Sequence, residues 1–380
     1  MDGQVEAQGS ALNSNSIVDV LGKVIKQDEE KISISNSTGA IIGYLFKDRI
    51  NLHLKSQLER DRIPYLTQFR DFETFITNDI VYINQTKVRV LYKAEAKENV
   101  LFLTNQCNNN CVFCPDTEFV RQTRSNVTLD VLREIISLMD VNTPYLCITG
   151  GEPTILRDEL FKVLSLCRER LNNTEYIMLT NGRMFSSNRY TNEFLKAKPL
   201  HMTLGIPLYS NSASLHDTIT SVEGSFEQTT IGITNLIQGG QAVEIRVVVN
   251  RLNVSVLEGI AQMIASRFPK VFRVNFMALE MSGNAFKNRE EVWIDFNKAM
   301  PEVSKAMVYL LKHGINAFLY NFPLCYVPAE LWHVSIKSIS EHKVRYLNEC
   351  AECDALEFCG GFFVSTLKQA KALGVTPIHL

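Results

Sequence analysis

The sequence contains no long hydrophobic run, and no stretch of it approaches the roughly 18 consecutive apolar residues that span a membrane. Charge of one sign is not in excess either. The 39 Lys and Arg stand against 41 Asp and Glu, so no overall field draws the chain to nucleic acid or to an anionic membrane. The first residues, MDGQVEAQGSALNSNS, lack the basic start and apolar stretch of a secretory signal. We therefore expect a cytoplasmic protein with no nucleic-acid or membrane partner, built of two or three compact units at about 150 residues per domain.

From about residue 100, short apolar runs alternate with amphipathic stretches, a pattern typical of βα units around a parallel sheet. Six candidate strands are NVLFLTN (99–105), PYLCITG (144–150), EYIMLTN (175–181), LHMTLGIPL (200–208), AVEIRVVVN (242–250) and VFRVNFMAL (271–279). Two stretches between them have apolar residues at helical spacing: Leu129, Leu132, Ile136 and Met139 behind the N-cap residue Thr128, and Leu160, Val163, Leu164, Cys167 and Leu171. The sequence thus predicts an α/β fold, in which the isolated Cys147 and Cys167 are small core hydrophobes.

The two ends of the chain have different patterns. Before about residue 95, KISISNS, AIIGYLF, DIVYIN and KVRVLYK are short β-rich runs separated by polar turns such as Asn84-Gln85-Thr86. After the sixth strand, residues 293–314 have a helical pattern, INAFLY (315–320) is a candidate strand, and the rest is rich in loops. We predict a β-rich amino-terminal domain (1–95), a core domain (96–285) and a carboxyl-terminal extension (286–380).

Nine cysteines need an explanation, because clustered thiols in a reducing compartment more often hold metal or do chemistry than form disulfides. Three of them, Cys107, Cys111 and Cys114, follow the first predicted strand directly. Thiolate is the ligand that iron-sulfur clusters use, and three such cysteines can hold three irons of a four-iron cluster and leave the fourth open. A structural zinc site would need a fourth ligand nearby, but no His or Cys lies within the next thirty residues.

Candidate ligand contacts lie at the ends of the next strands. The second strand ends in Gly150-Gly151-Glu152, where a glycine pair allows close approach to a ligand and the carboxylate can accept hydrogen bonds from an ammonium group. The third ends in Thr180 and Asn181. Functional residues of α/β barrels lie at the carboxyl ends of strands, so both turns are candidate sites. Three residues of the fourth and fifth strand regions are either further ligand contacts or ordinary polar strand residues: Tyr209, Ser210 and Arg246.

The order CNNNCVFC, then GGEP, then TNG resembles the radical S-adenosylmethionine (SAM) superfamily over roughly residues 97–282. The resemblance implies a partial, TIM-like (β/α)6 barrel whose SAM-binding 4Fe-4S cluster is held by the three loop cysteines and cleaves SAM reductively. It also implies that Phe113 lies near adenine and Glu152 near the SAM amino group. The other expected SAM contacts are Gly150, Gly151, Thr180, Asn181, Ser210 and Arg246. LHDTIT and GSFEQTTIGITNLIQGG are similar to the fourth-helix region of peptide-modifying members.

Four more cysteines lie in the carboxyl-terminal extension: Cys325, Cys350, Cys353 and Cys359. Four thiolates can close one metal site completely, which suits either a fully ligated 4Fe-4S cluster or a structural zinc ion. This part resembles the SPASM/twitch extension of radical SAM peptide maturases, which implies an auxiliary 4Fe-4S cluster. One such cluster is expected rather than two, because GGFF (360–363) stands where full SPASM domains have another cysteine.

The runs LTNQCNNNCVFC, LGIPLYS, EIRVVVNR and CGGFF together resemble the HxsC maturases of the His-Xaa-Ser system. That resemblance implies a small, ribosomally made precursor peptide as substrate. It also implies an electron donor such as flavodoxin or ferredoxin, and a second radical SAM maturase of the same system, as partners. Two alternatives stay open: a radical SAM enzyme acting on a small molecule or a protein, and a non-catalytic iron-sulfur or zinc protein. GGEP and TNG favour catalysis, since a sensor needs no SAM pocket.

Overall fold

The structure is a computed structural model that describes residues 6–8, 19–26, 29–69, 72–84, 87–123, 125–340, 343–369 and 374–380. Gln85 and Thr86 of the predicted turn, and most of the stretch used to exclude a secretory signal, lie outside these ranges. Among the helices in these ranges, none is long and apolar enough to cross a membrane. The chain forms two compact units: unit 1 (Met1–Thr104, Asn126–Ile177, Ala197–Met202) and unit 2 (Asn105–Ser125, Met178–Lys196, Thr203–Leu380). The predicted domain limits 1–95, 96–285 and 286–380 stay a prediction.

All six predicted core strands are present in an eight-stranded sheet whose strands follow one another in chain order. Every pair with a defined register is parallel, so the α/β fold class is confirmed. The strands are β8 (Asn99–Phe102), β9 (Tyr145–Thr149), β10 (Glu175–Leu179), β11 (Met202–Pro207), β12 (Ala242–Val249), β13 (Arg273–Ala278), β14 (Ala317–Tyr320) and β15 (Ser335–Ile336). β14 confirms the candidate strand INAFLY, whereas two-residue β15 is too short to leave a periodic signal.

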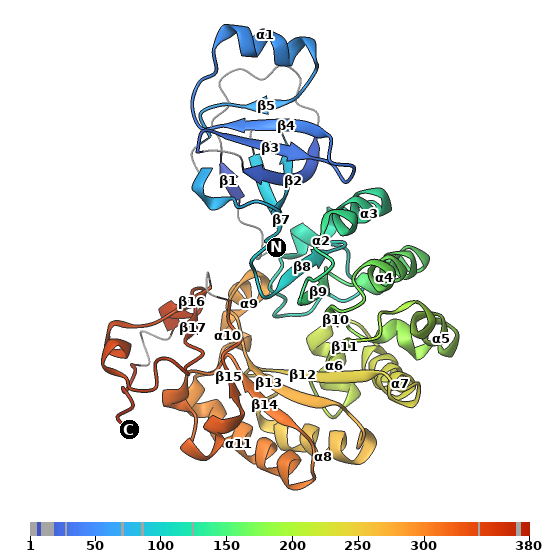
Figure 1. Ribbon diagram of the computed structural model, residues 1–380. Helices are drawn as coiled ribbons and strands as arrows, with labels where there is room; N and C mark the ends of the chain where they lie inside the picture. The colour runs from blue at the N-terminus through green and yellow to red at the C-terminus, as the bar shows by residue number, and fades with distance from the viewer. Residues whose placement is uncertain are drawn as a thin grey trace. The chain divides into compact units, whose positions relative to one another are not determined.

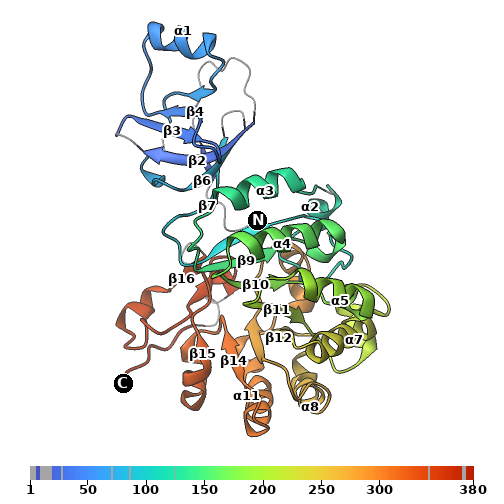
Figure 2. The ribbon, with the colours of Figure 1, turned by 45° about the vertical axis from the view of Figure 1, so that its right-hand side comes forward.

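In unit 1, the helices α3 (Leu129–Leu138) and α4 (Asp158–Arg170) lie side by side (Figures 1 and 2). Thr128 caps α3 as predicted, since its Oγ1 accepts a hydrogen bond from the Val131 N–H at 3.4 Å. Cys167 is fully buried on the apolar stripe of α4, as expected of a core hydrophobe. Cys147 differs, because it is only half-buried. Its neighbours in β9 point into the core, and alternation along the strand turns Cys147 to the less covered face.

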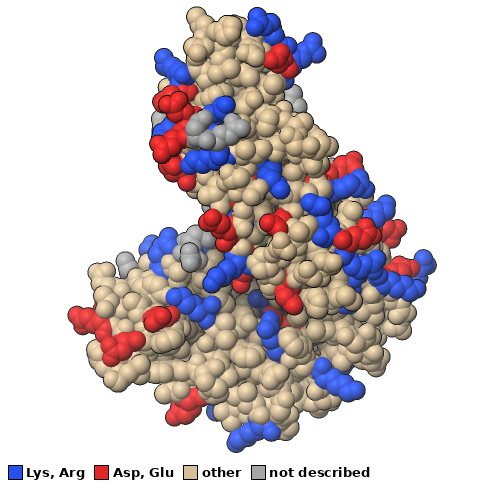
Figure 3. All heavy atoms as spheres, in the orientation of Figure 1, with Lys and Arg blue, Asp and Glu red and all other residues tan. Residues whose placement is uncertain are grey.

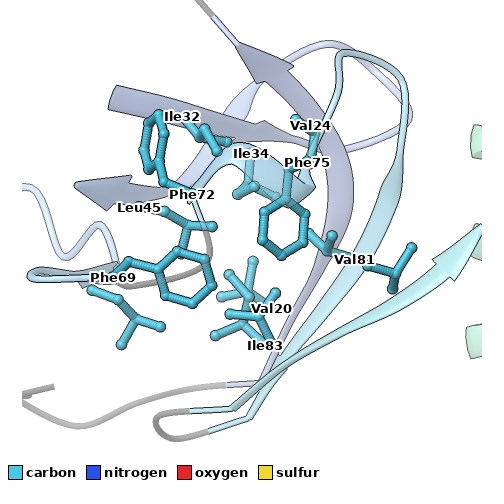
Figure 4. Packing of buried hydrophobic residues seen from close by; sticks show 13 residues of the cluster. Val20, Val24, Ile32, Ile34, Leu45, Phe69, Phe72, Phe75, Val81 and Ile83 are labelled. Carbon is cyan, nitrogen blue, oxygen red and sulfur yellow. The ribbon is translucent and has the colours of Figure 1, made fainter. Parts of the chain in front are cut away.

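The amino-terminal part of unit 1 is a seven-stranded sheet, so the predicted β-rich region is confirmed. Its strands are β1 (Glu6–Gln8), β2 (Val20–Lys26), β3 (Lys31–Ser35), β4 (Ile41–Phe46), β5 (Tyr65–Leu66), β6 (Ile80–Asn84) and β7 (Lys87–Tyr92), with helix α1 (Leu52–Arg60) between β4 and β5. Apolar side chains from its strands and three phenylalanines fill one core (Figure 4). The sequence did not reveal β2, because Gly22 interrupts its β-branched pattern. There a Cβ would come 2.5 Å from the Ser35 carbonyl oxygen, so the close approach of β3 requires glycine.

In unit 2, α8 (Leu257–Arg267) and α11 (Phe296–Lys312) pack on one face of β12, β13 and β14 (Figures 1 and 2). α11 confirms the predicted helical segment. The other helices of this unit are α2 (Glu118–Gln122), α5 (Asn188–Ala197, whose last residue belongs to unit 1), α6 (Ala213–Thr220), α7 (Ser225–Gln238), α9 (Gly283–Lys287) and α10 (Arg289–Val292). The remainder is rich in loops as predicted, with short 3-10 turns and the antiparallel pair β16 (Val344–Arg345) and β17 (Phe362–Phe363).

The surface carries both signs of charge. On the face drawn in Figure 3, Lys and Arg side chains are interspersed with Asp and Glu. This mixture agrees with the formal net charge of −2.

Candidate functional site

The loop that carries Cys107, Cys111 and Cys114 lies between β8 and α2 and has almost no regular structure of its own. Its backbone is held from elsewhere in unit 2. The N–H groups of Asn110 and Val112 donate to the last carbonyls of α6, each at 2.9 Å. Because these bonds replace a helix or sheet ladder, the loop keeps a defined shape while its three thiols stay partly exposed.

Asn284, in α9, holds the cysteines themselves. Its backbone N–H donates to the carbonyl of Cys114 at 2.8 Å, and its Nδ2 donates to the carbonyl of Cys111 at 3.1 Å. The preceding Gly283 leaves no room for a side chain, since a Cβ there would lie 2.1 Å from the Pro115 carbonyl oxygen. The glycine therefore allows α9 to approach the loop closely.

The middle of the loop is fixed by two residues that follow β10. Asn181 Nδ2 donates to Asn108 Oδ1 at 2.5 Å. Arg183 Nη1 donates to the Asn108 carbonyl at 2.6 Å and to Asn109 Oδ1 at 2.8 Å. Asn181 was predicted as a SAM contact. The structure brings it to the cysteine loop, where it makes a hydrogen bond that orients the loop.

The electrostatics of the loop centre on Arg121, a residue that the sequence patterns did not single out. Burial raises the pKa of Cys111, and the neighbouring thiols of Cys114 and Cys107 raise it further, while Arg121 lowers it. Burial also raises the pKa of Cys114, and Arg121 again opposes this rise. The guanidinium is nearly buried and donates to the Asp116 carbonyl at 2.6 Å and to Asn110 Oδ1. It therefore favours the thiolate form that metal ligation requires.

Phe113 packs against Tyr209 in an edge-to-face pair with ring centroids 4.9 Å apart. Both side chains are buried in one apolar cluster. Burial raises the pKa of Tyr209 well above its ordinary value, the three loop cysteines add to the rise, and Arg246 opposes it. Tyr209 thus lies within electrostatic reach of both the cysteine loop and β12. Ser210 is fully buried, and its Oγ accepts from the Ser212 N–H at 3.1 Å.

The Gly150-Gly151-Glu152 turn belongs to unit 1, and close contacts with Thr104 explain its glycines. A Cβ on Gly150 would lie 2.4 Å from the Thr104 carbonyl oxygen, and the Gly151 N–H donates to that same oxygen at 2.7 Å. Glu152 is fully buried, and its Oε1 accepts from the Thr154 N–H at 3.0 Å and from the Thr154 hydroxyl at 2.5 Å. One carboxylate oxygen therefore caps the turn.

Thr180, at the end of β10, is likewise engaged in the fold. Its N–H donates to the Gly205 carbonyl at 3.1 Å, and its Oγ1 accepts from the Gly182 N–H at 3.2 Å. It shapes the turn from which Asn181 and Arg183 reach the cysteine loop.

Arg246 belongs to a polar group on the face of β12 and β13 away from α8 and α11. Its Nε lies 3.2 Å from Glu244 Oε1, without the geometry of a hydrogen bond. Glu244 Oε2 is paired with Arg273 at 2.6 Å. Asn275 lies directly opposite Arg246 in the parallel register and is fully buried, and neither of its amide atoms makes a hydrogen bond of good geometry to the residues that the structure describes. The sequence patterns drew attention to Arg246 alone in this group.

The four cysteines of the carboxyl-terminal extension come together although up to 34 residues separate them, from position 325 to position 359. They line one narrow cavity with Pro323, Leu324, Tyr346, Leu356, Phe362, Val375 and Ile378. Burial raises the pKa of Cys325 to about 12, with further contributions from Cys359, Cys350 and Cys353. Backbone N–H groups donate to two of the sulfurs: Leu324 and Gly361 to Cys359, each at 3.4 Å, and Ile378 to Cys353 at 3.3 Å. The described residues that line this cavity include no Lys or Arg, whereas Arg121 lies beside Cys111 and Cys114.

The two cysteine groups therefore differ in chemistry. Three thiols with a nearby arginine fit a cluster that keeps one iron open, while four thiols around an apolar cavity fit a fully ligated one. In the part of the chain that the structure describes, no three His, Cys, Asp or Glu side chains are placed to hold a single metal ion.

Residues 101–264, which contain the cysteine loop and the strands β9 to β12, match the model of the Radical SAM superfamily. Over these residues the chain is similar to the radical SAM superfamily.

Several known proteins are similar to part of this chain. AlbA of Bacillus subtilis, an antilisterial bacteriocin subtilosin biosynthesis protein, is 26% identical over 46% of this chain and 38% of its own length. The AdoMet-dependent heme synthase of Nitratidesulfovibrio vulgaris is 24% identical over 40% of each chain. The solved structure of SuiB from Streptococcus suis, bound to the precursor peptide SuiA, has a TM-score of 0.48 and 16% identity over 60% of this chain and 49% of that one. The chain spans about two fifths of the length of these two curated relatives, 38% and 40%.

Proposed function

We propose that this chain cleaves SAM reductively and modifies a ribosomally made peptide. The observation that carries the proposal is the loop of Cys107, Cys111 and Cys114, which bonds from α6, α9 and the turn after β10 hold in one conformation. When bound there, a 4Fe-4S cluster supplies one electron to SAM, which yields methionine and a 5′-deoxyadenosyl radical.

In this proposal the three loop cysteines are the only protein ligands of the barrel cluster. Arg121 stabilises their thiolate forms, because its charge lowers the pKa of Cys111 and Cys114. Arg183 and Asn284 hold the loop in one conformation before a cluster binds. Binding of the cluster therefore does not have to order the three thiols. Phe113, packed edge-to-face on Tyr209, is assigned to the adenine side of the SAM site.

We assign Glu152 to the SAM amino group. Its Oε1 already accepts two hydrogen bonds from Thr154, so Glu152→Gln is a better test than Glu152→Ala, because an amide oxygen can still cap the turn. Loss of the charge should weaken SAM binding roughly tenfold to a hundredfold, as expected for one charge-assisted hydrogen bond, and leave the iron content unchanged. Glu159→Gln, at an exposed position of α4, is the matched control. Unchanged SAM affinity in Glu152→Gln would show that the turn is structural only.

We assign Gly150, Gly151, Thr180, Ser210 and Arg246 supporting parts in the SAM site. Gly150, Gly151 and Thr180 shape the two turns, through the close contact with Thr104 and the bond to Gly182. Arg246 is the charged residue among these five. Its Nε makes no hydrogen bond among the described residues.

The cysteines of the carboxyl-terminal extension are assigned to an auxiliary 4Fe-4S cluster. The four thiols line one otherwise apolar cavity, which can hold such a fully ligated cluster. The resemblance of this part to SPASM/twitch extensions is what favours the cluster over a zinc ion. Anaerobically reconstituted protein should hold about eight irons per chain. About four irons and one zinc in a fully active preparation would contradict this assignment.

The two clusters should do different work. The barrel cluster has an open iron and the auxiliary cluster has none, so only the first can bind SAM. Cys114→Ala should abolish 5′-deoxyadenosine formation, whereas Cys359→Ala should keep some of it and lose peptide modification. The ratio of deoxyadenosine formed to peptide modified decides this. If Cys359→Ala loses SAM cleavage as completely as Cys114→Ala, with the barrel cluster still visible by electron paramagnetic resonance, the division is wrong.

For the substrate we propose a His-Xaa-Ser repeat peptide, with flavodoxin or ferredoxin as electron donor and a second radical SAM maturase as companion. The resemblance of CNNNCVFC, LGIPLYS and CGGFF to HxsC maturases supports this. A short neighbouring reading frame that encodes His-Xaa-Ser repeats would support the assignment. Modification of its purified peptide product, seen as a mass change that depends on SAM, tests it directly.

A small-molecule substrate is the second candidate, and the match to the AdoMet-dependent heme synthase favours it. Incubation of the reconstituted enzyme with the peptide and, separately, with porphyrin substrates separates the two. Deoxyadenosine formation that rises only with a porphyrin would favour the second candidate.

A further inference from the structure

The segment 374–380 is fastened to the cysteine-lined cavity of the carboxyl-terminal extension. The carbonyl of Ile378 accepts from the Asp354 N–H at 2.9 Å, and the Leu380 N–H donates to Asp354 Oδ2 at 3.0 Å. The Tyr326 hydroxyl donates to the Gly374 carbonyl. Asp354 directly follows Cys353, and Tyr326 directly follows Cys325. The segment is thus tied to residues next to two of the four cysteines.

Two side chains of the segment, Val375 and Ile378, form part of the cavity wall. Both are apolar, so they separate the thiols from water on that side. Ile378 makes a second contribution, because its backbone N–H points at Cys353 Sγ, 3.3 Å away.

Backbone N–H groups donate to two of these sulfurs with clear geometry. Cys359 accepts two, from Leu324 and Gly361, and Cys353 accepts one, from Ile378. A hydrogen bond to a ligand sulfur stabilises the more negative, reduced form of an iron-sulfur cluster and so raises its reduction potential. One of these three bonds comes from Ile378, which lies 19 residues beyond Cys359, the last of the four cysteines.

We propose that residues 374–380 are part of the auxiliary-cluster site, in which Ile378 is a positioning residue. Its N–H raises the potential of the cluster through Cys353, and its side chain shields the cluster from solvent. The proposal rests on the auxiliary cluster assigned above. The tail of the chain therefore helps to set the electron affinity of a cluster whose ligands it does not supply.

Three full-length variants separate the two contributions. Ile378→Pro removes the N–H but keeps an apolar side chain and the carbonyl that Asp354 uses. Ile378→Ala keeps the N–H but removes most of the apolar side chain that Ile378 contributes to the cavity wall. Thr376→Ala is the matched control, because Thr376 belongs to the same segment, is exposed and lies outside the cavity.

Each variant is reconstituted anaerobically, and its auxiliary cluster is titrated under electron paramagnetic resonance. The two cluster signals are distinguished by adding SAM, which changes only the signal of the cluster with an open iron. The rate at which an iron chelator removes the auxiliary cluster is measured alongside.

We expect a lower potential in Ile378→Pro than in the control, and a several-fold faster loss of iron to the chelator in Ile378→Ala. If Ile378→Pro retains the auxiliary cluster and the reduction potential of that cluster equals that of the control, the proposal is wrong. If Ile378→Pro takes up no auxiliary cluster, the chelator rates decide, and equal rates in Ile378→Ala and Thr376→Ala overturn the proposal. Zinc in place of iron in the wild-type extension would instead contradict the auxiliary cluster itself.

Discussion

Replacing Arg183 with methionine removes three hydrogen bonds and keeps the apolar stem of the side chain. Two of the bonds reach the loop between Cys107 and Cys111, at the Asn108 carbonyl and Asn109 Oδ1. The third joins Arg183 Nε to Gln228 Oε1 in α7 at 2.7 Å. Arg183→Met therefore unfastens the cysteine loop without touching a cysteine.

The size of the effect follows from the two loop bonds. Each is a hydrogen bond from a charged group, worth about 1.5–3 kcal/mol, and Arg183 is half-buried, so the lower end applies. Two bonds give about 3 kcal/mol, or about a hundredfold at 1.4 kcal/mol per factor of ten. The loop conformation that brings the three thiols together should therefore lose about 3 kcal/mol of stability relative to other loop conformations.

The assay is the rate at which an iron chelator removes the barrel cluster from anaerobically reconstituted protein. Arg183→Met should lose this cluster far faster than wild type, while the auxiliary cluster is unaffected. Arg189→Met is the control, because Arg189 is exposed and pairs with Glu193 at 3.1 Å on α5. Equal rates in Arg183→Met and Arg189→Met would refute the idea that Arg183 orders the loop.

Three further substitutions test the fold around the site. Gly150→Ala forces a Cβ to 2.4 Å from the Thr104 carbonyl, so it should destabilise the protein in urea by about 1–3 kcal/mol even without SAM. Burial lowers the pKa of His216 to about 4, so the stability it contributes is complete above about pH 6.5 and is lost as the pH falls toward 4. In His216→Phe, the urea midpoint should therefore change less between pH 6.5 and pH 4 than it does in wild type. Asn275→Leu replaces a buried amide that makes no hydrogen bond of good geometry among the described residues and should raise the free energy of unfolding by about 1–3 kcal/mol, whereas a decrease would reveal a partner for the amide.

The strands could be predicted, and the loop cysteines could be recognised as one group, because their signals are local. β8 to β13 show as short apolar runs bounded by turn residues, and Cys107, Cys111 and Cys114 fall within eight positions. The α/β class follows from the same alternation.

The residues that hold the cysteine loop in place could not be predicted, because they are distant in sequence from the loop residues that they contact. Arg183 lies 75 residues from Asn108, and Asn284 lies 173 residues from Cys111. An arginine or asparagine in such a place has no spacing that distinguishes it from a surface residue. Asn181 was noticed for its position at a strand end, but its bond to Asn108 appears only in the fold. The role of Gly22 in β2 is likewise a matter of contact with β3.

The most direct test of the central claim is anaerobic incubation of the reconstituted protein with SAM and dithionite, followed by quantification of 5′-deoxyadenosine. Wild-type protein should form deoxyadenosine and methionine in equal amounts, and Cys114→Ala should form neither while its auxiliary cluster remains. Wild-type protein that holds its full iron and forms no deoxyadenosine, or Cys114→Ala protein that forms as much as wild type, would contradict the claim that these three cysteines support SAM cleavage.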